Sequence, residues 1–311
     1  MLCYDTKLGG AYCGDSLELI DTLEDNSIDL VITSPPFALL KQKEYGNVEQ
    51  SEYVDWLCMF MSKIYNKLKD TGSLVIDLGS AYNKGEPTYN LYQYRVLLKL
   101  CDEFGYKLAQ PFVWFNISAL PAPIEWVNRR KLRCKNSFDT VWWLSKTSFP
   151  KADVTKVLKP YSKRMKRFLK EPERVFKYNT EHPSGYGASD RWTKNNGGAI
   201  PPNVLSISNA ESNSSYLRGC RHIGIKAHPA RFPVGIPEFF INFLTDENDL
   251  VVDIFSGSNT TGSTADKLGR RWKSFELNLE YVASSSFRFI ENMDDAREVY
   301  DKILNKEVVH F

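Results

Sequence analysis

Residues 34–37, SPPF, form the first part of the chain whose types and spacing could do chemistry. Pro35 and Pro36 remove two backbone donors and restrict φ, so the neighbouring carbonyl oxygens point in defined directions. The Ser34 hydroxyl and such carbonyls could together accept both hydrogens of an exocyclic amino group, and Phe37 offers a ring on which a planar base could stack. A Pro-Pro turn beside a core phenylalanine would account for the same residues equally well.

A second such stretch is VVDIFSGSNTTG, residues 251–262, in which an apolar strand ends in a turn that opens a helix. Open α/β sheets hold nucleotide-like ligands at turns of this kind. Gly257 would let the backbone approach the ligand closely. Glu276, at the end of the next predicted strand, could accept hydrogen bonds from both hydroxyls of a ribose. Taken alone, the segment fits a nucleoside-binding turn, a dinucleotide enzyme or a structural turn.

The elements that must position these residues follow an α/β pattern in the first third of the chain. Apolar spacing predicts alternating strands and helices at 28–33, 54–68, 73–79, 91–104 and 107–115. Units of this length imply a parallel sheet with helices on its faces. In such a sheet the first two strands lie side by side and bring Ser34 and Asp77 to the carboxyl edge, where ligands bind.

The α/β pattern returns near the C-terminus, with strands and helices predicted at 236–244, 249–255, 263–269, 272–277 and 281–290. The region between differs, because residues 121–150 hold prolines, a basic cluster and an aromatic strand, and residues 179–203 are rich in Gly, Asn, Ser and Pro. We therefore predict a doubly wound, mostly parallel sheet. We expect its halves, 1–120 and 224–311, to form one domain around an inserted region, 121–223.

The net charge of +2 hides an uneven distribution. Residues 151–177 hold ten Lys/Arg and three Asp/Glu, a balance of +7, whereas residues 246–311 hold eight and thirteen, a balance of −5. Such a split is typical of a polyanion-facing region on an acidic body, although a solvated helix face would look the same.

Bulk composition narrows the class of protein. Hydrophobic residues are 42% and charged residues 25% of the chain, as expected for a soluble globular protein. Seven acidic residues among the first thirty argue against a secretory signal, and no apolar run approaches the ~20 residues of a membrane helix. The six cysteines are scattered and form no CxxC pair, so we expect a reduced cytoplasm and no zinc site.

Together, SPPF and the turn at 251–262 resemble the amino-methyltransferases of DNA that use S-adenosyl-L-methionine. In that family a [DNS]PP[YF] tetrapeptide binds the target amine and an FxGxG-like turn binds the cofactor. Here SPPF precedes the turn with the insertion between them, which resembles the permuted β arrangement of a Rossmann-like fold. The serine and phenylalanine of SPPF resemble the N4-cytosine subgroup more than the adenine subgroup. Asn259 departs from the pattern, because the broader family often has glycine there.

The resemblance extends along nearly the whole chain. YCGDSLELI (12–20) is similar to the family's acidic element, and KAHPARFP (226–233) to the segment that cradles the methionine end of the cofactor. KEYGN (43–47), EWVNRRK (125–131) and IPPN (200–203) resemble the PvuII-type methyltransferases. The resemblance implies a cofactor-binding set of Asp15, His228, Pro229, Phe232, Asp253, Phe255, Gly257, Ser258, Asn259, Thr260, Thr261 and Glu276. Within it we expect His228 to order its loop rather than act as a base.

The implied chemistry is direct methyl transfer to an exocyclic nitrogen. Such an amine is a poor nucleophile, and hydrogen bonds from it to Ser34 and to the Pro35 carbonyl would favour a pyramidal nitrogen. Ser34 would pass a proton toward Asp77, although Asp77 could equally be a capped structural acid. The chain has no Pro-Cys pair, which ring-carbon methylation by covalent adduct requires in its own family. The catalytic set is therefore expected to be Ser34, Pro35, Pro36, Phe37 and Asp77.

The resemblance also implies double-stranded DNA as the substrate, with the target base flipped out of the helix. The resemblance further implies that 1–120 is the half of the catalytic domain with the target-base motif, 224–311 its cofactor-binding half and the insertion, 121–223, the DNA target-recognition region. Basic side chains of the insertion suit contacts with phosphates or guanine edges, namely Arg129, Arg130, Lys131, Arg133, Lys156, Lys163, Arg164 and Arg167. PvuII-type specificity would mean the site CAGCTG, modified on the inner cytosine. A companion restriction endonuclease is a further expectation from the family.

Other functions stay open at this point. An N6-adenine methyltransferase could use the same scaffold, because both amines offer the same pair of donors. A non-catalytic nucleotide- or DNA-binding module would not need SPPF beside a complete cofactor turn. A dehydrogenase is disfavoured, because residues 257–262 lack GxGxxG.

Overall fold

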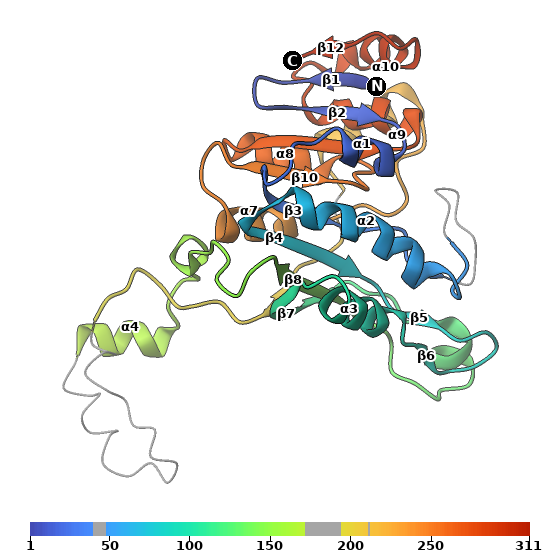
Figure 1. The fold of residues 1–311 in the computed structure, drawn as a ribbon. Helices are drawn as coiled ribbons and strands as arrows, with labels where there is room; N and C mark the ends of the chain where they lie inside the picture. Colours follow the sequence, from blue (N-terminus) through green and yellow to red (C-terminus); the bar gives the residue numbers. More distant parts are fainter. Residues whose placement is uncertain (40–47, 172–193, 211) are drawn as a thin grey trace, which may run out of the picture. The chain divides into compact units, whose positions relative to one another are not determined.

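The computed structural model describes residues 1–39, 48–171, 194–210 and 212–311 (Figure 1), so KEYGN (43–47) lies outside the described residues. The chain divides into two compact units, one made of Met1–Lys151 with Asn203–Phe311 and the other of Ala152–Pro202. Within the described residues, every helix is too short or too polar to cross a bilayer.

The larger unit is built on a mixed sheet of ten strands among the described residues, in the order β12-β1-β2-β11-β10-β3-β4-β8-β7-β9. The strands are β1 Leu2–Asp5, β2 Gly9–Cys13, β3 Ile28–Thr33, β4 Leu68–Leu78, β7 Lys107–Phe115, β8 Phe138–Ser145, β9 Val204–Ser206, β10 Leu250–Asp253, β11 Arg271–Glu276 and β12 Val309–His310. Parallel pairing runs from β2 through β11, β10 and β3 to β4, whereas β8 is antiparallel to both of its neighbours. The predicted mostly parallel α/β sheet is confirmed.

Helices cover both faces of this sheet. They are α1 Ser16–Asp21, α2 Tyr53–Lys67, α3 Tyr92–Asp102, α6 Ser215–Ile223, α7 Gly235–Leu244, α8 Thr260–Lys267, α9 Leu279–Ser285 and α10 Ala296–Leu304. Two adjacent residues of β8 show the two layers. Trp142 packs on Tyr94 of α3, while Trp143 packs on Phe243 of α7, with ring centroids 6.0 and 5.1 Å apart. Alternate residues of a strand face opposite sides, so α3 and α7 lie on opposite faces.

Local sequence explains the central strands. All six residues of β3, IDLVIT, are buried, as are the last seven residues of β4, 72–78. Largely apolar runs of this kind are typical of parallel strands covered on both faces. The predicted strands 28–33 and 107–115 match β3 and β7, and β3 pairs with β4 in parallel as expected. The terminal strands β1, β2 and β12 had not been predicted.

One predicted helix was too long. The segment 281–290 forms α9 only as far as Ser285, and a 3₁₀ turn, Ser286–Arg288, follows. The Arg288 guanidinium is buried there and donates to the Ser258 carbonyl (2.5 Å) and to the Thr260 hydroxyl (2.8 Å). These bonds hold residues 286–288 against the turn before α8, so this segment does not continue α9 as an α-helix.

The smaller unit contains a 3₁₀ turn, Val154–Val157, and α4 Lys163–Lys170, whose first turn is capped by the Ser162 hydroxyl. A bridge between Lys159 and Ala199 closes it. This unit is shorter than the predicted insertion, 121–223, because 138–145 is a central strand of the sheet and 204–206 an edge strand. That the insertion recognises the DNA target stays a prediction.

Candidate functional site

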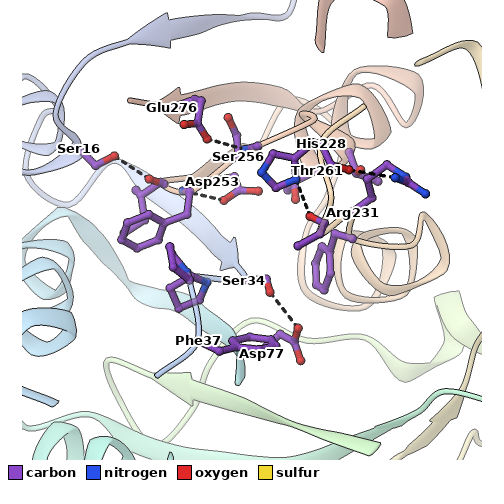
Figure 2. A pocket seen from close by; sticks show the side chains of 18 of the residues that line it. Ser16, Ser34, Phe37, Asp77, His228, Arg231, Asp253, Ser256, Thr261 and Glu276 are labelled. Atoms are coloured by element: carbon purple, nitrogen blue, oxygen red, sulfur yellow. Dashed lines mark hydrogen bonds between the residues drawn. The ribbon is translucent and has the colours of Figure 1, made fainter. Parts of the chain in front are cut away.

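The carboxyl ends of the parallel strands border one cavity of ≈ 550 Å³. Figure 2 shows side chains from several elements pointing into it, among them Ser34, Asp77 and Glu276. The predicted residues in its lining are Asp15, Ser34, Pro35, Pro36, Phe37, Asp77, His228, Phe232, Asp253, Phe255, Gly257, Thr260, Thr261 and Glu276. Parallel strands meet at one edge, which explains why residues far apart in sequence converge here.

The register of β3 on β4 places Ser34 beside Asp77. Thr33 pairs with Ile76, so the next residue of each strand falls on the same side of the sheet. The Ser34 hydroxyl donates to Asp77 Oδ2 at 3.0 Å (Figure 2). Asp77 is 1% exposed, and its Oδ1 has no hydrogen-bond partner in the described part of the chain. Burial raises the pKa of this carboxyl well above its usual value, the nearby Asp139 raises it further, and the bond from Ser34 lowers it.

The end of β4 is held from α3. The Tyr92 hydroxyl donates to the Gly79 carbonyl, and Gln93 Nε2 donates to the Leu78 carbonyl at 2.6 Å. Thr140 of β8 donates to the same Leu78 carbonyl at 3.0 Å. Because both helix and strand bind these carbonyls, the backbone beside Asp77 is fixed.

Phe37 packs directly on the backbone that follows β4. A Cβ atom at Gly79 would lie only 2.1–2.8 Å from the Phe37 ring, a distance no side chain can occupy. Position 79 therefore has to be glycine for the ring to sit at the edge of the cavity.

Two acids, the buried Asp253 and the half-buried Glu276, order the turn after β10. Asp253 Oδ1 accepts from the Thr33 hydroxyl (2.7 Å) and the Phe255 N–H (3.1 Å), and burial raises the pKa of Asp253 to about 6. The two carboxylate oxygens of Glu276 accept from the N–H groups of Gly257 and Asn278, each at 2.9 Å. Burial raises the pKa of Glu276, and these backbone donors lower it.

His228 closes the turn from the other side. Its backbone N–H donates to the Tyr216 hydroxyl (2.7 Å), and its Nδ1 lies 2.8 Å from the Ala230 carbonyl. Burial lowers the pKa of His228 to about 4, so the imidazole is neutral near pH 7. A Cβ at Gly257, where φ is +49°, would touch this ring at 3.2 Å. That His228 orders its loop rather than acts as a base stays a prediction.

The acidic element reaches the cavity through α1. Asp15 caps this helix by accepting from the Leu17 N–H at 2.8 Å, and the Ser16 hydroxyl donates to the Ile254 carbonyl at 2.6 Å. The exposed Asp15 carboxylate therefore stands at a fixed place on the rim, next to the end of β10.

Comparison with known proteins identifies the family. The family model described as DNA methylase matches residues 28–287. M.PvuII of Proteus hauseri, described as a Type II methyltransferase, is 54% identical over 307 residues, which cover 98% of this chain and 91% of that protein. This chain belongs to the DNA methylase family. M.BglII of Bacillus subtilis is also similar, at 26% identity over 88% of this chain and 67% of that one.

Solved structures agree with the fold of this DNA methylase. The structure described as PvuII DNA methyltransferase (cytosine-N4-specific) superimposes with a TM-score of 0.81 and 49% identity, covering 99% of this chain and 97% of that one. A DNA modification methylase of Thermus thermophilus, solved with S-adenosyl-L-methionine, has a TM-score of 0.55 at 18% identity, with 93% and 95% covered. The latter likeness concerns the fold alone.

Three residues of the predicted cofactor set do not line the cavity of the methylase: Pro229, Ser258 and Asn259. Asn259 is fully buried at φ +51° and caps α8, and its side chain bonds Gly262, Ser274 and Tyr4. Asparagine tolerates a left-handed conformation, which is how it can stand where the broader family often has glycine. Its bonds hold the turn before α8 from inside the fold.

Several lining residues had not been predicted: Ser16, Trp56, Phe60, Trp114, Asn116, Asp139, Arg231 and Ser256. Trp114 and Asn116 lie at the end of β7, a position that could have been inferred from the predicted strand 107–115. Trp56 and Phe60 of α2 pack on Phe255, with ring centroids 5.6 and 5.0 Å apart, and form an apolar wall. Both residues lie within the predicted helix 54–68, but its apolar spacing gave no sign of the cavity.

The predicted DNA-binding residues fall into two groups in different units. Lys156, Lys163, Arg164 and Arg167 belong to the smaller unit, and Arg129, Arg130, Lys131 and Arg133 to the larger one. Arg129 and Arg130 are exposed and pair with Glu125, at 3.3 and 2.9 Å. Arg133 differs, because its guanidinium carbon lies 4.7 and 4.2 Å from the ring centroids of Tyr82 and Tyr89. It also donates to the Pro87 carbonyl at 2.6 Å, so it clamps the hairpin of β5 (Ala81–Tyr82) and β6 (Tyr89–Asn90).

We expect Gly79→Ala to displace the Phe37 ring and lower kcat/KM for DNA by about 10²-fold, because small misplacements at a reacting centre are costly. Initial rates of methylation measure this. In the double variant with Phe37→Ala the clash is gone, so adding Gly79→Ala to Phe37→Ala should change little. Wild-type kcat/KM in Gly79→Ala would contradict the packing described.

We expect Arg133→Ala to lower the free energy of unfolding by about 1–2 kcal/mol, because two cation–π contacts and a hydrogen bond are lost. Arg129→Ala, which removes an exposed ion pair, should change it by about 0.5 kcal/mol or less. Denaturant titrations of both variants provide the comparison, and equal effects would show that Arg133 is not a structural clamp.

Proposed function

We propose that this DNA methylase transfers a methyl group from S-adenosyl-L-methionine to the exocyclic N4 amine of a cytosine flipped out of duplex DNA. The observation that carries the proposal is the hydrogen bond between Ser34, the first residue of SPPF, and Asp77. It lies in the same cavity as the turn after β10. The 54% identity to M.PvuII and the 0.81 TM-score with a cytosine-N4-specific enzyme support cytosine N4 as the target.

The residues around the turn fit the proposed cofactor. Gly257 lines the cavity without a side chain, so its backbone is accessible to a ligand, and the Glu276 carboxylate is held by two backbone N–H groups with lone pairs to spare for hydroxyls. Glu276 would bind the ribose, Asp15 would face the adenine, and His228 with Phe232 would border the methionine end. When bound, S-adenosyl-L-methionine supplies an electrophilic methyl group.

The SPPF residues would bind the target amine. Ser34 and the Pro35 carbonyl accept its two hydrogens, Pro36 holds the corner rigid, and Phe37 stacks on the base. The Ser34 hydroxyl already donates to Asp77, so it can take a proton from the amine while passing its own to the carboxylate. A raised pKa makes the ionised Asp77 a stronger base for that proton.

Duplex DNA is the proposed macromolecular partner. Flipping the base costs a few kcal/mol, which contacts between basic side chains and phosphates would offset. Lys163 and Arg167 lie four residues apart on α4 and therefore share one helix face that could follow a phosphate backbone. The PvuII-type resemblance favours CAGCTG as the site, and a companion restriction endonuclease as the partner of a Type II system.

The product identifies the activity. Incubation with labelled S-adenosyl-L-methionine and unmodified DNA, followed by digestion to nucleosides and mass spectrometry, should give N4-methylcytosine. Ser34→Ala and Asp77→Asn should each lower kcat by about 10²–10⁴-fold, because the amine loses its acceptor or its base. Ser62→Ala, a serine on α2 bonded to Met59, serves as the matched control and should retain wild-type turnover.

Other products would revise the proposal in defined ways. N6-methyladenine would keep the fold and mechanism but refute the cytosine assignment. The absence of any methylated base would favour a non-catalytic nucleotide- or DNA-binding module, and full turnover by Ser34→Ala would remove the proposed role of SPPF.

The proposed phosphate contacts make binding depend on salt. Replacing Lys163 or Arg167 by alanine should reduce the slope of log K against log salt concentration by about 1 per lost contact. Lys302→Ala, which removes an exposed cation paired with Glu298 on α10, should leave the slope unchanged. Fluorescence anisotropy over a salt series measures both, and an unchanged slope in all variants would exclude α4 from the DNA interface.

A further inference from the structure

We propose that Asp139 forms a carboxyl pair with Asp77, and that this pair rather than Asp77 alone accepts the proton released from the target amine. The inference rests on the proposed function, because it concerns the base of the same methyl transfer. Asp139 does not touch the target amine and acts through Asp77, so it is a positioning residue.

The strand register brings the two carboxyls to the same face. Asp77 of β4 pairs with Val141 of β8, and Leu78 pairs with Thr140. Asp139 is two residues from Val141, so it points to the same side of the sheet as Asp77 and is its diagonal neighbour across the antiparallel pair. Both side chains line the cavity.

Because Asp77 is buried, a second carboxyl nearby strongly affects its protonation. Asp77 is 1% exposed, its Oδ2 accepts from Ser34, and its Oδ1 has no hydrogen-bond partner in the described part of the chain. The negative charge of Asp139 raises the pKa of Asp77, so ionisation of one carboxyl disfavours ionisation of the other and the two favour holding one proton between them. Asp139 is half-buried and bonded to the backbone of Ser80, so it is the member of the pair that can exchange with cavity water.

The other titratable groups around the pair are few among the described residues. Tyr92 faces it from α3 and Tyr53 lies behind Tyr92 on α2, with ring centroids 4.9 Å apart. Burial raises the pKa of Tyr92 well above its usual value, so that phenol stays neutral. The remaining titratable side chains in the cavity lining are Asp15, His228, Arg231, Asp253 and Glu276.

The proton passes from the amine to Asp77 through the Ser34 hydroxyl. When the methylated amine loses its proton, the N–H bond breaks and its electron pair stays on nitrogen. The Ser34 oxygen takes that proton and gives its own to Asp77 Oδ2. The pair holds it until Asp139, on the accessible side, releases it to water. No oxidant or reductant takes part.

Replacement of the second carboxyl tests the pair. Turnover requires ionised Asp77, so kcat rises with pH through the pKa of Asp77. Removing the neighbouring negative charge favours the ionised form, so Asp139→Asn should move the acid limb of the kcat profile to lower pH by about one unit. Asp139→Glu keeps the charge and should keep the limb near its wild-type position.

A measurement without DNA or cofactor complements the kinetics. Infrared spectroscopy of the protein alone reports protonated carboxyl groups, to which the buried Asp253 also contributes. The pair predicts a band that persists well above the ordinary pKa of aspartate, is lost at lower pH in Asp139→Asn and remains in Asp253→Asn. This readout also serves if a variant folds poorly, because the wild-type titration is itself informative. Wild-type protein lacking such a band would overturn the pair.

The outcomes separate the two proposals. A wild-type enzyme that forms no methylated base contradicts the proposed function, whatever Asp139 does. A wild-type enzyme that forms N4-methylcytosine, with an acid limb that Asp139→Asn leaves in place, contradicts the carboxyl pair alone.

Discussion

Parallel pairing of β3 with β4 is the constraint on which the site depends. It places Ser34 beside Asp77 at the carboxyl edge, and the neighbouring pairing of β3 with β10 brings Asp253 and the turn that follows it to the same edge. A slip of one residue in either pairing would turn the side chains to the other face of the sheet. The sheet is buried on both faces by helices, so its register is strongly specified. The same register sets the positions of the side chains at the carboxyl edge.

Several polar groups of the cavity are satisfied by bonds within the protein, whereas among the described lining residues Asp77 Oδ1, Arg231 Nε and Thr261 Oγ1 are buried without a hydrogen-bond partner. Asp253 and Glu276 accept from backbone N–H groups, and the neutral ring of His228 sits against the Ala230 carbonyl. Groups bonded in this way are held in place and order the turn. Asp77 Oδ1 lacks such a bond in the described residues, and a buried carboxyl oxygen left without a partner is costly. That cost is consistent with a group kept for proton transfer.

The strand β8 connects the catalytic site to the rest of the chain. It lies between β4 and β7 and runs antiparallel to both, so its first residues reach the carboxyl edge while its last residue leads toward the smaller unit. The chain returns to the larger unit just before β9, which pairs with β7. The segment between β8 and β9 can therefore change in sequence without disturbing the central register.

The sequence alone determined the fold class and the two motifs, because apolar runs, a Pro-Pro corner and a glycine turn act locally on the backbone. Only the tertiary structure decided which other residues share the cavity. Asp139 entered it because β8 inserts beside β4, a pairing between distant segments that no local pattern encodes. Asn259 is likewise held inside the fold by Tyr4, and Arg133 packs on the rings of Tyr82 and Tyr89. Residue type indicates what a side chain can do, and long-range packing decides what it meets.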